Sequence, residues 1–513
     1  MSSLIGAIDQ GTSSSRFLVF DLRDESVIAE HQIPIRSVYP QEGWVEQDPM
    51  ELLDTVKQCL NQVHGQLHQS GRSLDLKAVG VTNQRESTVV WDKTTGRPIH
   101  NAIIWLDTRT QSTVNALMKC AGSKGKDSLR DKCGLPISTY FSAVKLRWLL
   151  DNIPEVSEAA QAKRLLFGTV DSWLIWNLTG GVNGGRHVTD VTNASRTMLM
   201  NLKTLQWDQE LLDFFGVQLD VLPRICSSAE IYGHLNFSGS DWPDVPIAGC
   251  LGDQQAALVG HQSFNAGTAK STLGTGCFML FNVGEKIVTS SHGLLSTVGY
   301  QLGPDEAPVY ALEGSIAIAG AAVKWLQDQL GIIKEPREIE LVASKVEDTS
   351  GVYFVPAFSG LFAPHWRSDA KGVITGLTQF SNASHICRAV LEAIAFQTRD
   401  IVDCMYQDSG LTLNKLLVDG AMTKNNLLMQ IHSDILNIEV VRPEMPEFTA
   451  LGAAFAAGKA VGLWEPGRIS GNAQKLFRPV KSPAWRTEKL NYWHKSLEKS
   501  LNEEPLKLRN SLS

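Results

Sequence analysis

A polar turn near the N-terminus holds the first residues whose types and spacing could do chemistry. It lies between two apolar, strand-like runs at 4–8 and 17–20. Its polar members are Asp9, Gly11, Thr12, Ser13, Ser14 and Arg16. A phosphate group needs backbone N–H donors, small hydroxyls and a cation, and a carboxylate beside it can hold Mg²⁺. The turn therefore fits a phosphate site with Asp9 as a metal ligand, although a β-hairpin with a Ser/Thr-rich turn fits it equally.

A second turn, Gly274-Thr275-Gly276, lies between the apolar stretches 271–273 and 277–281. Two glycines allow the backbone to approach a second phosphate group closely, but a glycine pair is more often only a turn. Taken together, the two turns predict a nucleotide bound between two parts of the chain. Neither is a Walker loop, because the chain contains no G-x-x-x-x-G-K-[ST] motif.

Asp253 is the candidate catalytic base. It follows the apolar run 247–251, and a carboxylate at the carboxyl end of a buried strand faces the crevice where ligands bind in α/β proteins. From there it could accept the proton of an attacking hydroxyl during phosphoryl transfer. A role as N-cap of a helix over 254–259 is compatible with this.

The elements that must position these residues alternate between strands and helices, which predicts an α/β fold. Strands are predicted at 4–8, 17–20, 78–81, 88–91, 247–251, 271–281, 352–355 and 415–418. Helices are predicted at 50–63, 143–150, 317–330 and 384–404, and a loop over 233–246. Because 513 residues exceed the roughly 250 to 300 that one core supports, we expect two domains. We place them at 1–253, with the first polar turn, and 254–470, with the second, followed by a peripheral tail at 471–513.

Composition excludes several classes of function. Charged residues make up 20% and hydrophobic residues 43% of the chain, and the net charge is −7 without a dense Lys/Arg stripe, so we expect no nucleic-acid partner. The eight cysteines lack metal-ligand spacing and are expected to be reduced core thiols. No signal peptide and no apolar run of roughly 18 residues occurs, so we expect a cytoplasmic protein without an integral membrane segment.

Several motifs carry a resemblance to a known family. They are Asp9-Gln-Gly-Thr12, Val81-Thr-Asn-Gln-Arg85-Glu86, Ile104-Trp105-Leu-Asp107, Gly252-Asp253-Gln254-Gln255 and Gly274-Thr-Gly-Cys-Phe278. Two longer signatures begin at Tyr140-Phe-Ser-Ala-Val-Lys145 and Gly372-Val-Ile-Thr-Gly376. Across about residues 4–465 the chain resembles the glycerol kinases, members of the sugar-kinase family with two FGGY signatures. The resemblance implies two actin/hexokinase-like (ribonuclease H-like) α/β domains that flank a central cleft.

The resemblance also implies roles for individual residues. The residues implied to bind glycerol are Arg85, Glu86, Trp105, Tyr140, Asp253, Gln254 and Phe278, with Trp105 and Phe278 as apolar walls. Those implied to bind ATP are Thr12, Ser13, Ser14, Arg16, Gly274, Thr275, Gly320, Lys324, Ala421 and Asn425. Asp253 is the implied general base, and Asp9 and Asp253 are the implied Mg²⁺ ligands. Without the resemblance, Arg85-Glu86 would be interpreted as a surface ion pair and the two aromatic residues as core.

Two positions depart from the family pattern. Lys324 stands where many glycerol kinases have Gln, and Ala421 stands where a second Gly is usual. An Ala that had to adopt a positive φ there would add strain of about 1 kcal/mol. The stretch 238–244 also lacks the Gly-rich, Arg-bearing loop with which bacterial relatives bind a sugar-bisphosphate inhibitor, so that regulation is not expected.

The resemblance implies ATP-dependent phosphorylation of glycerol to sn-glycerol 3-phosphate in a cleft whose closure excludes water. It further implies a homodimer or homotetramer. One alternative is another sugar kinase acting on a pentulose or a tetritol, which a substrate panel separates. A second is a weakened relative that acts as a binding or regulatory protein, motivated by Lys324 and Ala421.

Overall fold

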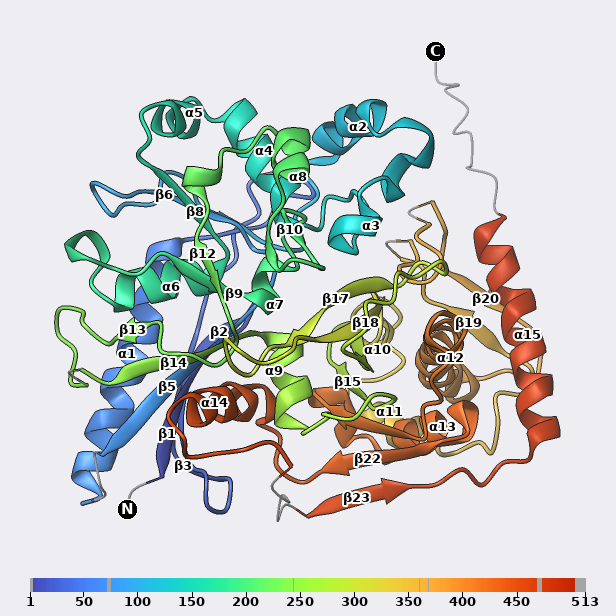
Figure 1. Ribbon diagram of the computed structural model, residues 1–513. Coiled ribbons are helices and arrows are strands. Elements are labelled where there is room, and N and C mark those ends of the chain that lie inside the picture. Colours follow the sequence, from blue (N-terminus) through green and yellow to red (C-terminus); the bar gives the residue numbers. More distant parts are fainter. Residues whose placement is uncertain are drawn as a thin grey trace.

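Two mixed β-sheets form the centre of the molecule in the computed structural model (Figure 1). The structure describes residues 3–71, 75–242, 244–358, 360–367, 369–467 and 473–502. The predicted tail at 471–513 therefore lies partly outside the described residues, at 471–472 and 503–513.

The first sheet has the strand order β13-β14-β5-β1-β2-β3. Its strands are β1 (Leu4–Gln10), β2 (Ser14–Asp21), β3 (Ser26–Pro34), β5 (Leu76–Asn83), β13 (Gly233–His234) and β14 (Pro246–Gly252). β1 and β14 both run parallel to β5, whereas β2 returns antiparallel to β1. Three strands from distant parts of the chain thus end at one edge of the sheet.

The second sheet has the order β17-β18-β16-β15-β21-β22-β23. Its strands are β15 (Ala269–Leu273), β16 (Cys277–Gly284), β17 (Leu295–Tyr300), β18 (Val309–Ile316), β21 (Lys415–Asp419), β22 (Glu439–Pro443) and β23 (Gln474–Phe477). β15, β21 and β22 are parallel neighbours, and β16 pairs antiparallel with β15. β23 comes from the segment predicted as a peripheral tail and forms the edge of this sheet.

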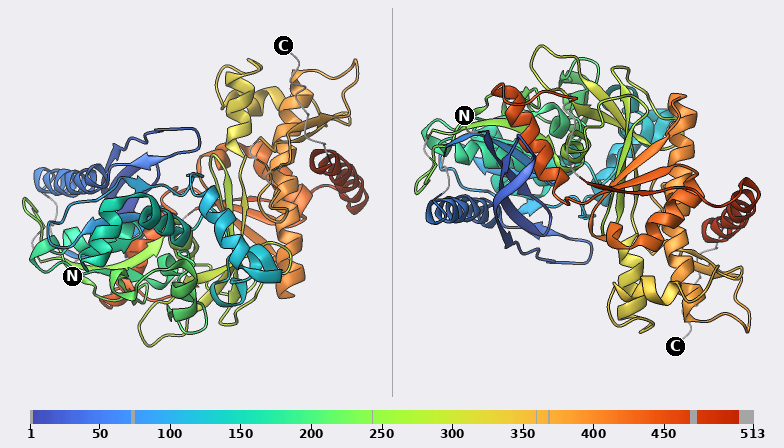
Figure 2. Two further views of the ribbon diagram at one scale, coloured as in Figure 1. Left: turned by 90° about the horizontal axis from the view of Figure 1, so that it is seen from above. Right: turned by 90° about the horizontal axis from the view of Figure 1, so that it is seen from below.

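Helices and short strand pairs cover the sheets. The longer helices are α1 (Pro49–Gln69), α4 (Ser142–Asn152), α12 (Ala383–Ser409), α13 (Asn426–Leu436), α14 (Phe448–Ala460) and α15 (Pro483–Leu501). The shorter ones include α6 (Val170–Leu178), α7 (Val191–Ala194), α9 (Asp253–Gly260), α10 (Gly320–Asp328) and α11 (Glu338–Ala343). The views in Figures 1 and 2 agree in placing α1 and α15 at opposite ends of the molecule.

Two helices join the sheets. α9 follows β14 directly and leads into the second sheet, and α14 packs against α9 and against the first sheet although it comes late in the chain. Small residues allow the close approach: a Cβ on Gly452 would lie 1.8 Å from the carbonyl oxygen of Ala256, and one on Gly80 would lie 2.1 Å from that of Ala453. The residues 448–460, which the sequence assigns to the second domain, therefore cover the first sheet.

This contact makes a testable prediction. Gly452→Ala should lower the free energy of unfolding by about 1–3 kcal/mol, because the added methyl group would overlap backbone that cannot rotate away. The matched control is Gly65→Ala inside α1, near its C-terminal end, where a Cβ meets no described atom within 4 Å and Ala favours the helix. Thermal unfolding followed by circular dichroism should show a lower melting temperature for Gly452→Ala only, and equal melting of both variants would contradict the close packing of α9 and α14.

The alternation of strands and helices predicted from the sequence is confirmed, with shifted element ends. The helix predicted at 317–330 begins only at Gly320, and the one predicted at 384–404 continues to Ser409. The predicted loop 233–246 instead begins with the short strand β13 and ends at the first residue of β14; its residue 243 lies outside the described residues. These differences arise because sheet pairing and packing, rather than local composition, fix where an element ends.

The burial of the cysteines agrees only in part with the expectation from the sequence. All eight cysteines are free, and six are buried, but Cys120 is exposed and Cys404 is half-buried, so the expectation of core thiols is wrong for Cys120. Within the described ranges, no helix combines the length and apolarity needed to cross a membrane.

Candidate active site

Parallel strands bring the candidate residues to one edge of the first sheet. In the sheet register, Gln10 of β1 and Gly252 of β14 both pair with Asn83 of β5. Asp9 therefore lies at the end of β1, and Asp253 directly follows β14. Residues that are far apart in sequence meet here because the carboxyl ends of parallel strands lie on the same side.

Asp253 is the accessible carboxylate of this edge. It is the first residue of α9, the N-cap being Gly252, and its Oδ1 accepts the backbone N–H of Gln254 at 2.7 Å. Its side chain is 28% exposed, and the Nε of Arg85 lies 3.3 Å from Oδ1. Desolvation by the surrounding protein raises the pKa of Asp253 to about 6, and the charge of Arg85 offsets this only in part. Such a carboxylate is ionised at neutral pH and is basic enough to accept a proton.

Arg85 and Glu86 do not form the surface ion pair that their adjacency indicates. Both are buried, at 3% and 1% exposure, and each pairs with a different partner. Arg85 donates to Glu313 of β18, and Glu86 accepts from Arg196.

Three aromatic side chains lie beside these charges. The indole of Trp105 makes edge-on contacts with Tyr140 and Phe278, with ring centroids 5.8 and 5.7 Å apart. All three side chains are half-buried and line a surface. Trp105 and Phe278 are therefore not the core residues that they would be taken for without the family resemblance. The indole N–H of Trp105 donates to the hydroxyl of Thr12 at 3.0 Å, which places the aromatic cluster against the first polar turn.

The first polar turn is a β-hairpin whose cation is held by two carboxylates. Asp9 and Arg16 face each other across the β1–β2 pair, and the Arg16 guanidinium donates to Asp9 and to Glu447 at the start of α14. Thr12 and Ser14 are half-buried and Ser13 is exposed, so their hydroxyls lie at the surface of the turn. The hairpin and phosphate-site interpretations are therefore compatible.

The second turn meets the start of α10. The N–H groups of Ala319 and Ala321 donate to the carbonyl of Thr275, and that of Gly320 donates to the carbonyl of Gly274. A Cβ on Gly320 would lie 2.6 Å from that Gly274 oxygen, which explains the glycine. At Gly274 a Cβ would meet no described atom within 4 Å, so the backbone there is open to a ligand.

A pocket of about 620 Å³ joins the first hairpin to the turn after β21. We call it the Arg16 pocket; its lining includes Arg16, Asp419, Gly420, Ala421, Lys424, Arg442, Glu447 and Lys475. The pocket is bordered by two of the predicted ATP-binding residues, Arg16 and Ala421, and by four basic side chains. Lys475 comes from β23, so the segment predicted as a tail contributes to it.

The turn after β21 resolves the question raised by Ala421. The positive φ falls on Gly420, at 93°, and Ala421 is not among the residues with a left-handed backbone. A Cβ on Gly420 would lie 2.5 Å from the carbonyl oxygen of Leu273, whereas Ala421 begins a short 3₁₀ turn. The strain expected for Ala421 therefore does not arise.

The last two predicted nucleotide-binding residues lie on helices near this turn. Asn425 is the N-cap of α13, where its side chain accepts the N–H of Leu428 at 2.8 Å. Lys324 lies on α10 with a 69% exposed side chain that pairs with Asp328 at 2.9 Å.

Sequence reasoning missed a second group of buried charges. Lys270 of β15 donates to the Gln254 side chain and, at 2.9 Å, to Thr272. Burial lowers the pKa of Lys270 to about 8, although the nearby carboxylates of Asp419 and Asp253 act in the opposite direction. A charged residue inside an apolar strand needs a buried partner, and this is the signal that could have identified Lys270 and Glu313.

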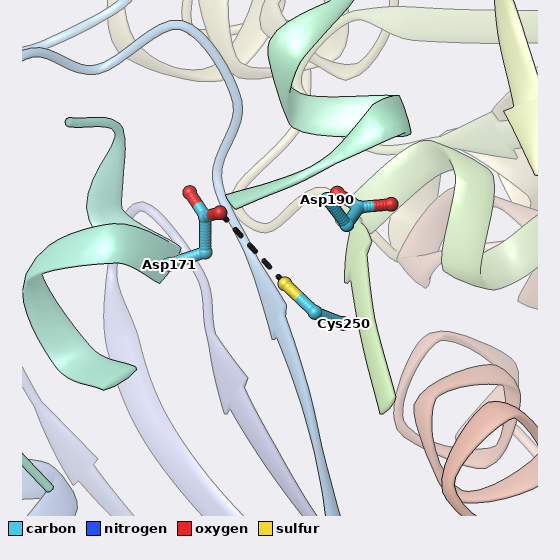
Figure 3. Close-up of side chains that lie close together, drawn as sticks. All are labelled: Asp171, Asp190 and Cys250. Atoms are coloured by element: carbon cyan, nitrogen blue, oxygen red, sulfur yellow. Dashed lines mark hydrogen bonds between the residues drawn. The ribbon is translucent and has the colours of Figure 1, made fainter. Parts of the chain in front are cut away.

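One more buried cluster has the composition of a metal site. Asp171, Asp190 and Cys250 place their ligand atoms within 4.8 Å of one another (Figure 3). Hydroxyls of Thr169 and Thr189 donate to Asp171, and the N–H groups of residues 192 and 193 donate to Asp190. Burial raises the pKa of Cys250 well above its ordinary value, so its thiol keeps its proton and donates to Asp171 at 3.8 Å. The protons of these donors occupy the positions that a cation would need, and the cluster is a hydrogen-bonded part of the core.

Comparisons with known proteins identify close relatives. The profile of the FGGY family of carbohydrate kinases matches with its N-terminal domain over residues 4–260 and with its C-terminal domain over residues 269–461. A glycerol kinase of Arabidopsis thaliana is 52% identical over 98% of both chains, and glycerol kinase 1 of Streptomyces avermitilis is 53% identical over 97% of both.

Solved structures confirm the predicted fold. The crystal structure of Plasmodium falciparum glycerol kinase with ADP has a TM-score of 0.91 at 38% identity, covering 98% of this chain and 99% of that one. Xylulose kinase of Lactobacillus acidophilus has a TM-score of 0.83 at 22% identity over 97% of both chains, and it shares the fold.

Proposed function

The chain belongs to the FGGY family of carbohydrate kinases, and on this basis we propose that it transfers the γ-phosphoryl group of ATP to glycerol. The products are sn-glycerol 3-phosphate and ADP. Curated glycerol kinases are 50–53% identical to it over nearly the whole chain, which supports glycerol as the substrate.

One structural observation carries the proposed site. The half-buried aromatic cluster of Trp105, Tyr140 and Phe278 lies between the hydroxyl of Thr12 and the buried Arg85-Glu86 pair. A small polyol needs apolar walls for its carbon backbone and fixed polar partners for its hydroxyls, and this arrangement supplies both. A polyol bound there would lie next to a turn suited to phosphate.

Asp253 takes the proton in the proposed mechanism. As the glycerol oxygen forms its bond to the γ-phosphorus, its proton passes to the Asp253 carboxylate and the bond from phosphorus to the leaving ADP oxygen breaks. Arg16 and the N–H groups of the first turn would stabilise the charge of the transferred group. Because this transition state is loose, positioning and electrostatics contribute more than the strength of the base.

Mg²⁺ fits the residues present. The predicted ligands Asp9 and Asp253 are oxygen donors at the ends of β1 and β14, at the same edge of the sheet, and Mg²⁺ prefers one or two carboxylates together with phosphate oxygens and water. When bound with ATP, the ion would neutralise charge on the phosphate oxygens.

We further propose that the nucleotide binds between the two sheets. The first turn, with Thr12, Ser13, Ser14 and Arg16, and the turn at Gly274 and Thr275 would hold the phosphates. Gly320, Ala421 and Asn425 would receive the adenosine, with Lys324 at the exposed end of this region. In this assignment residues 1–253 supply most of the polyol and phosphate site, and residues 254–470 supply the nucleotide site.

The turn at Gly420 tests this nucleotide site. Gly420→Ala should weaken ADP binding by about tenfold or more, because strain of about 1–3 kcal/mol and the contact with Leu273 displace the turn. The neighbouring Ala421→Gly is the matched control and should change the dissociation constant less than about twofold. Isothermal titration calorimetry measures both, and a tenfold gain in affinity for Ala421→Gly would show that the Cβ itself obstructs the nucleotide.

A substrate panel tests the choice of polyol. With MgATP, kcat/KM for glycerol should exceed that for erythritol or D-xylulose by about 10- to 200-fold per additional carbon unit, because the aromatic cluster limits the space. Release of ADP in a coupled assay measures this. A preference for the pentulose would identify another sugar kinase, and ATP binding without turnover of any polyol would identify the binding or regulatory protein.

Assembly and location are proposals as well. We propose a homodimer or homotetramer, which light scattering coupled to gel filtration would measure. The free thiols support a reducing, cytoplasmic compartment.

A further inference from the structure

Four charged residues are buried together between the two sheets. Arg85, Glu86, Arg196 and Glu313, which we call the ion quartet, are exposed by 3%, 1%, 0% and 0%. Removing such charges from water is costly unless each is paired with good geometry. Two arginines and two glutamates balance in charge, but Nη1 of Arg196 has no hydrogen-bond partner among the described residues, and Asp253 is the additional carboxylate at the edge of the quartet.

The ion quartet forms a closed ring. Arg85 donates through Nη1 and Nη2 to the two carboxylate oxygens of Glu313, at 2.6 and 2.9 Å. Arg196 donates through Nη2 to Glu313 at 3.3 Å and through Nε to Glu86 at 2.6 Å. Since Arg85 and Glu86 are consecutive, the backbone completes the ring.

The second sheet contributes a single member to the ring. Arg85 and Glu86 follow β5, Arg196 follows α7, and Glu313 lies in β18, 228 residues after Arg85. Glu313 holds both arginines and is therefore the ionic connection between the sheets at this site. Its carboxylate is strongly stabilised: although burial acts in the opposite direction, Arg196 and Arg85 lower the pKa of Glu313 to about 2.

The backbone of the ring is strained. Glu86 has a φ of 60°, in the left-handed region that non-glycine residues rarely adopt. Strain of this kind persists where the surroundings fix the residue on several sides, and it concentrates at functional sites. Here the two consecutive side chains are held by separate partners, Arg85 by Glu313 and Glu86 by Arg196.

The hydrogen bonds of Arg85 determine what it can do for a substrate. A guanidinium has five N–H donors. Nη1 has acceptors in Glu313 and Gln255, and Nη2 has one in Glu313. The Nε atom faces Asp253 at 3.3 Å. The remaining N–H of Nη2 has no acceptor among the described residues, and it is free to bind a hydroxyl.

From this geometry we propose that Glu313 is a positioning residue for phosphoryl transfer: it occupies both terminal nitrogens of Arg85 and so prevents the guanidinium from closing on Asp253. Arg196 supports Glu313 and holds Glu86 in place. The inference rests on the proposed function, in which Asp253 accepts the proton and Arg85 and Glu86 bind glycerol. Without Glu313, the carboxylates described next to Arg85 are those of Glu86 and Asp253. A tighter ion pair between Arg85 and Asp253 would occupy the carboxylate that has to accept the proton of glycerol.

The test is Glu313→Gln, which keeps the size of the side chain and removes its charge. We expect kcat to fall about 10- to 100-fold, as for other displaced catalytic groups, while the KM for MgATP changes less than about twofold. A loss confined to kcat, with the KM for MgATP retained, is a result that a loss of stability alone would not produce.

Two further variants separate positioning from folding. Glu313→Asp retains the carboxylate and should restore part of the rate. Glu46→Gln removes a charge from another buried Arg pair, 2.7 Å from Arg109, and should lower stability without lowering kcat.

The outcomes are distinguishable. An active wild type together with a Glu313→Gln variant that has the wild-type kcat overturns the positioning role, even if the variant melts at a lower temperature. If Glu313→Gln does not fold, a Glu313→Asp variant whose kcat matches that of Glu46→Gln overturns it too. A wild type without glycerol-dependent ADP release overturns the proposed function as well.

Discussion

Asp253→Asn is expected to reduce glycerol-dependent ADP formation by about 10²- to 10⁴-fold, the usual contribution of a positioned general base. The amide has the shape of the carboxylate and can still accept the N–H of Gln254, but it cannot take a proton from the substrate. Binding of ADP, measured by calorimetry, should remain within about twofold of wild type. The matched control is Asp220→Asn at an exposed acid outside the site, which should leave the rate unchanged.

The pH dependence gives an independent measure of the same role. Since the pKa of Asp253 is raised to about 6, protonation removes the acceptor as the pH falls below that value. The kcat/KM for glycerol in the wild type should therefore decline on the acid side near pH 6, and the residual activity of Asp253→Asn should lack this limb. A variant that keeps both the rate and the limb would exclude Asp253 as the base.

Arg16→Met is expected to reduce kcat/KM for ATP by about 10²- to 10³-fold, the effect of removing one group that stabilises the transition state. Arg16 is the cation of the first turn, it lines the Arg16 pocket, and its guanidinium contacts Asp9 and Glu447 together. Arg16→Lys should give an intermediate loss, because the ammonium keeps the charge but not the planar fork that contacts two carboxylates.

Controls for Arg16 distinguish a phosphate contact from a structural link. Arg36→Met removes an arginine whose side chain is 85% exposed and should leave ATP kinetics unchanged. If Arg16→Met bound and used ATP as the wild type does while its melting temperature fell, Arg16 would serve only to connect β1 with the start of α14.

Much of the fold could be predicted because strands and helices carry local signals. The strand over 247–251 is found as β14, and the helix over 50–63 is found as α1, which begins after the N-cap Asp48 and spans 49–69. The end of a helix such as α10 depends on contacts elsewhere: its first N–H groups donate to the turn at Gly274 and Thr275. Such contacts leave no periodic pattern in the sequence.

The candidate site was predictable where chemistry and motif coincide. Asp253 could be placed at the end of a strand, and Trp105 and Phe278 could be named from the family resemblance. The strand pattern and the family motifs are both contained in short stretches of sequence. A charge inside an apolar strand marks Glu313 and Lys270 as unusual, but the partners of these two residues and of Arg196 could not be predicted. Their partners are decided by which strands pair and in which register.

Local composition and short motifs were enough to predict the class of fold, the polar turns, the residues proposed for the chemistry and the family. The tertiary structure was needed to show that β14 and β1 flank β5, so that Asp253 and Asp9 lie at one edge, and that Glu313 reaches Arg85 across 228 residues. It also decided that Gly420 rather than Ala421 takes the positive φ. The physical reason is that buried charges, sheet register and close backbone contacts are satisfied between segments far apart in the chain, where no local pattern records them.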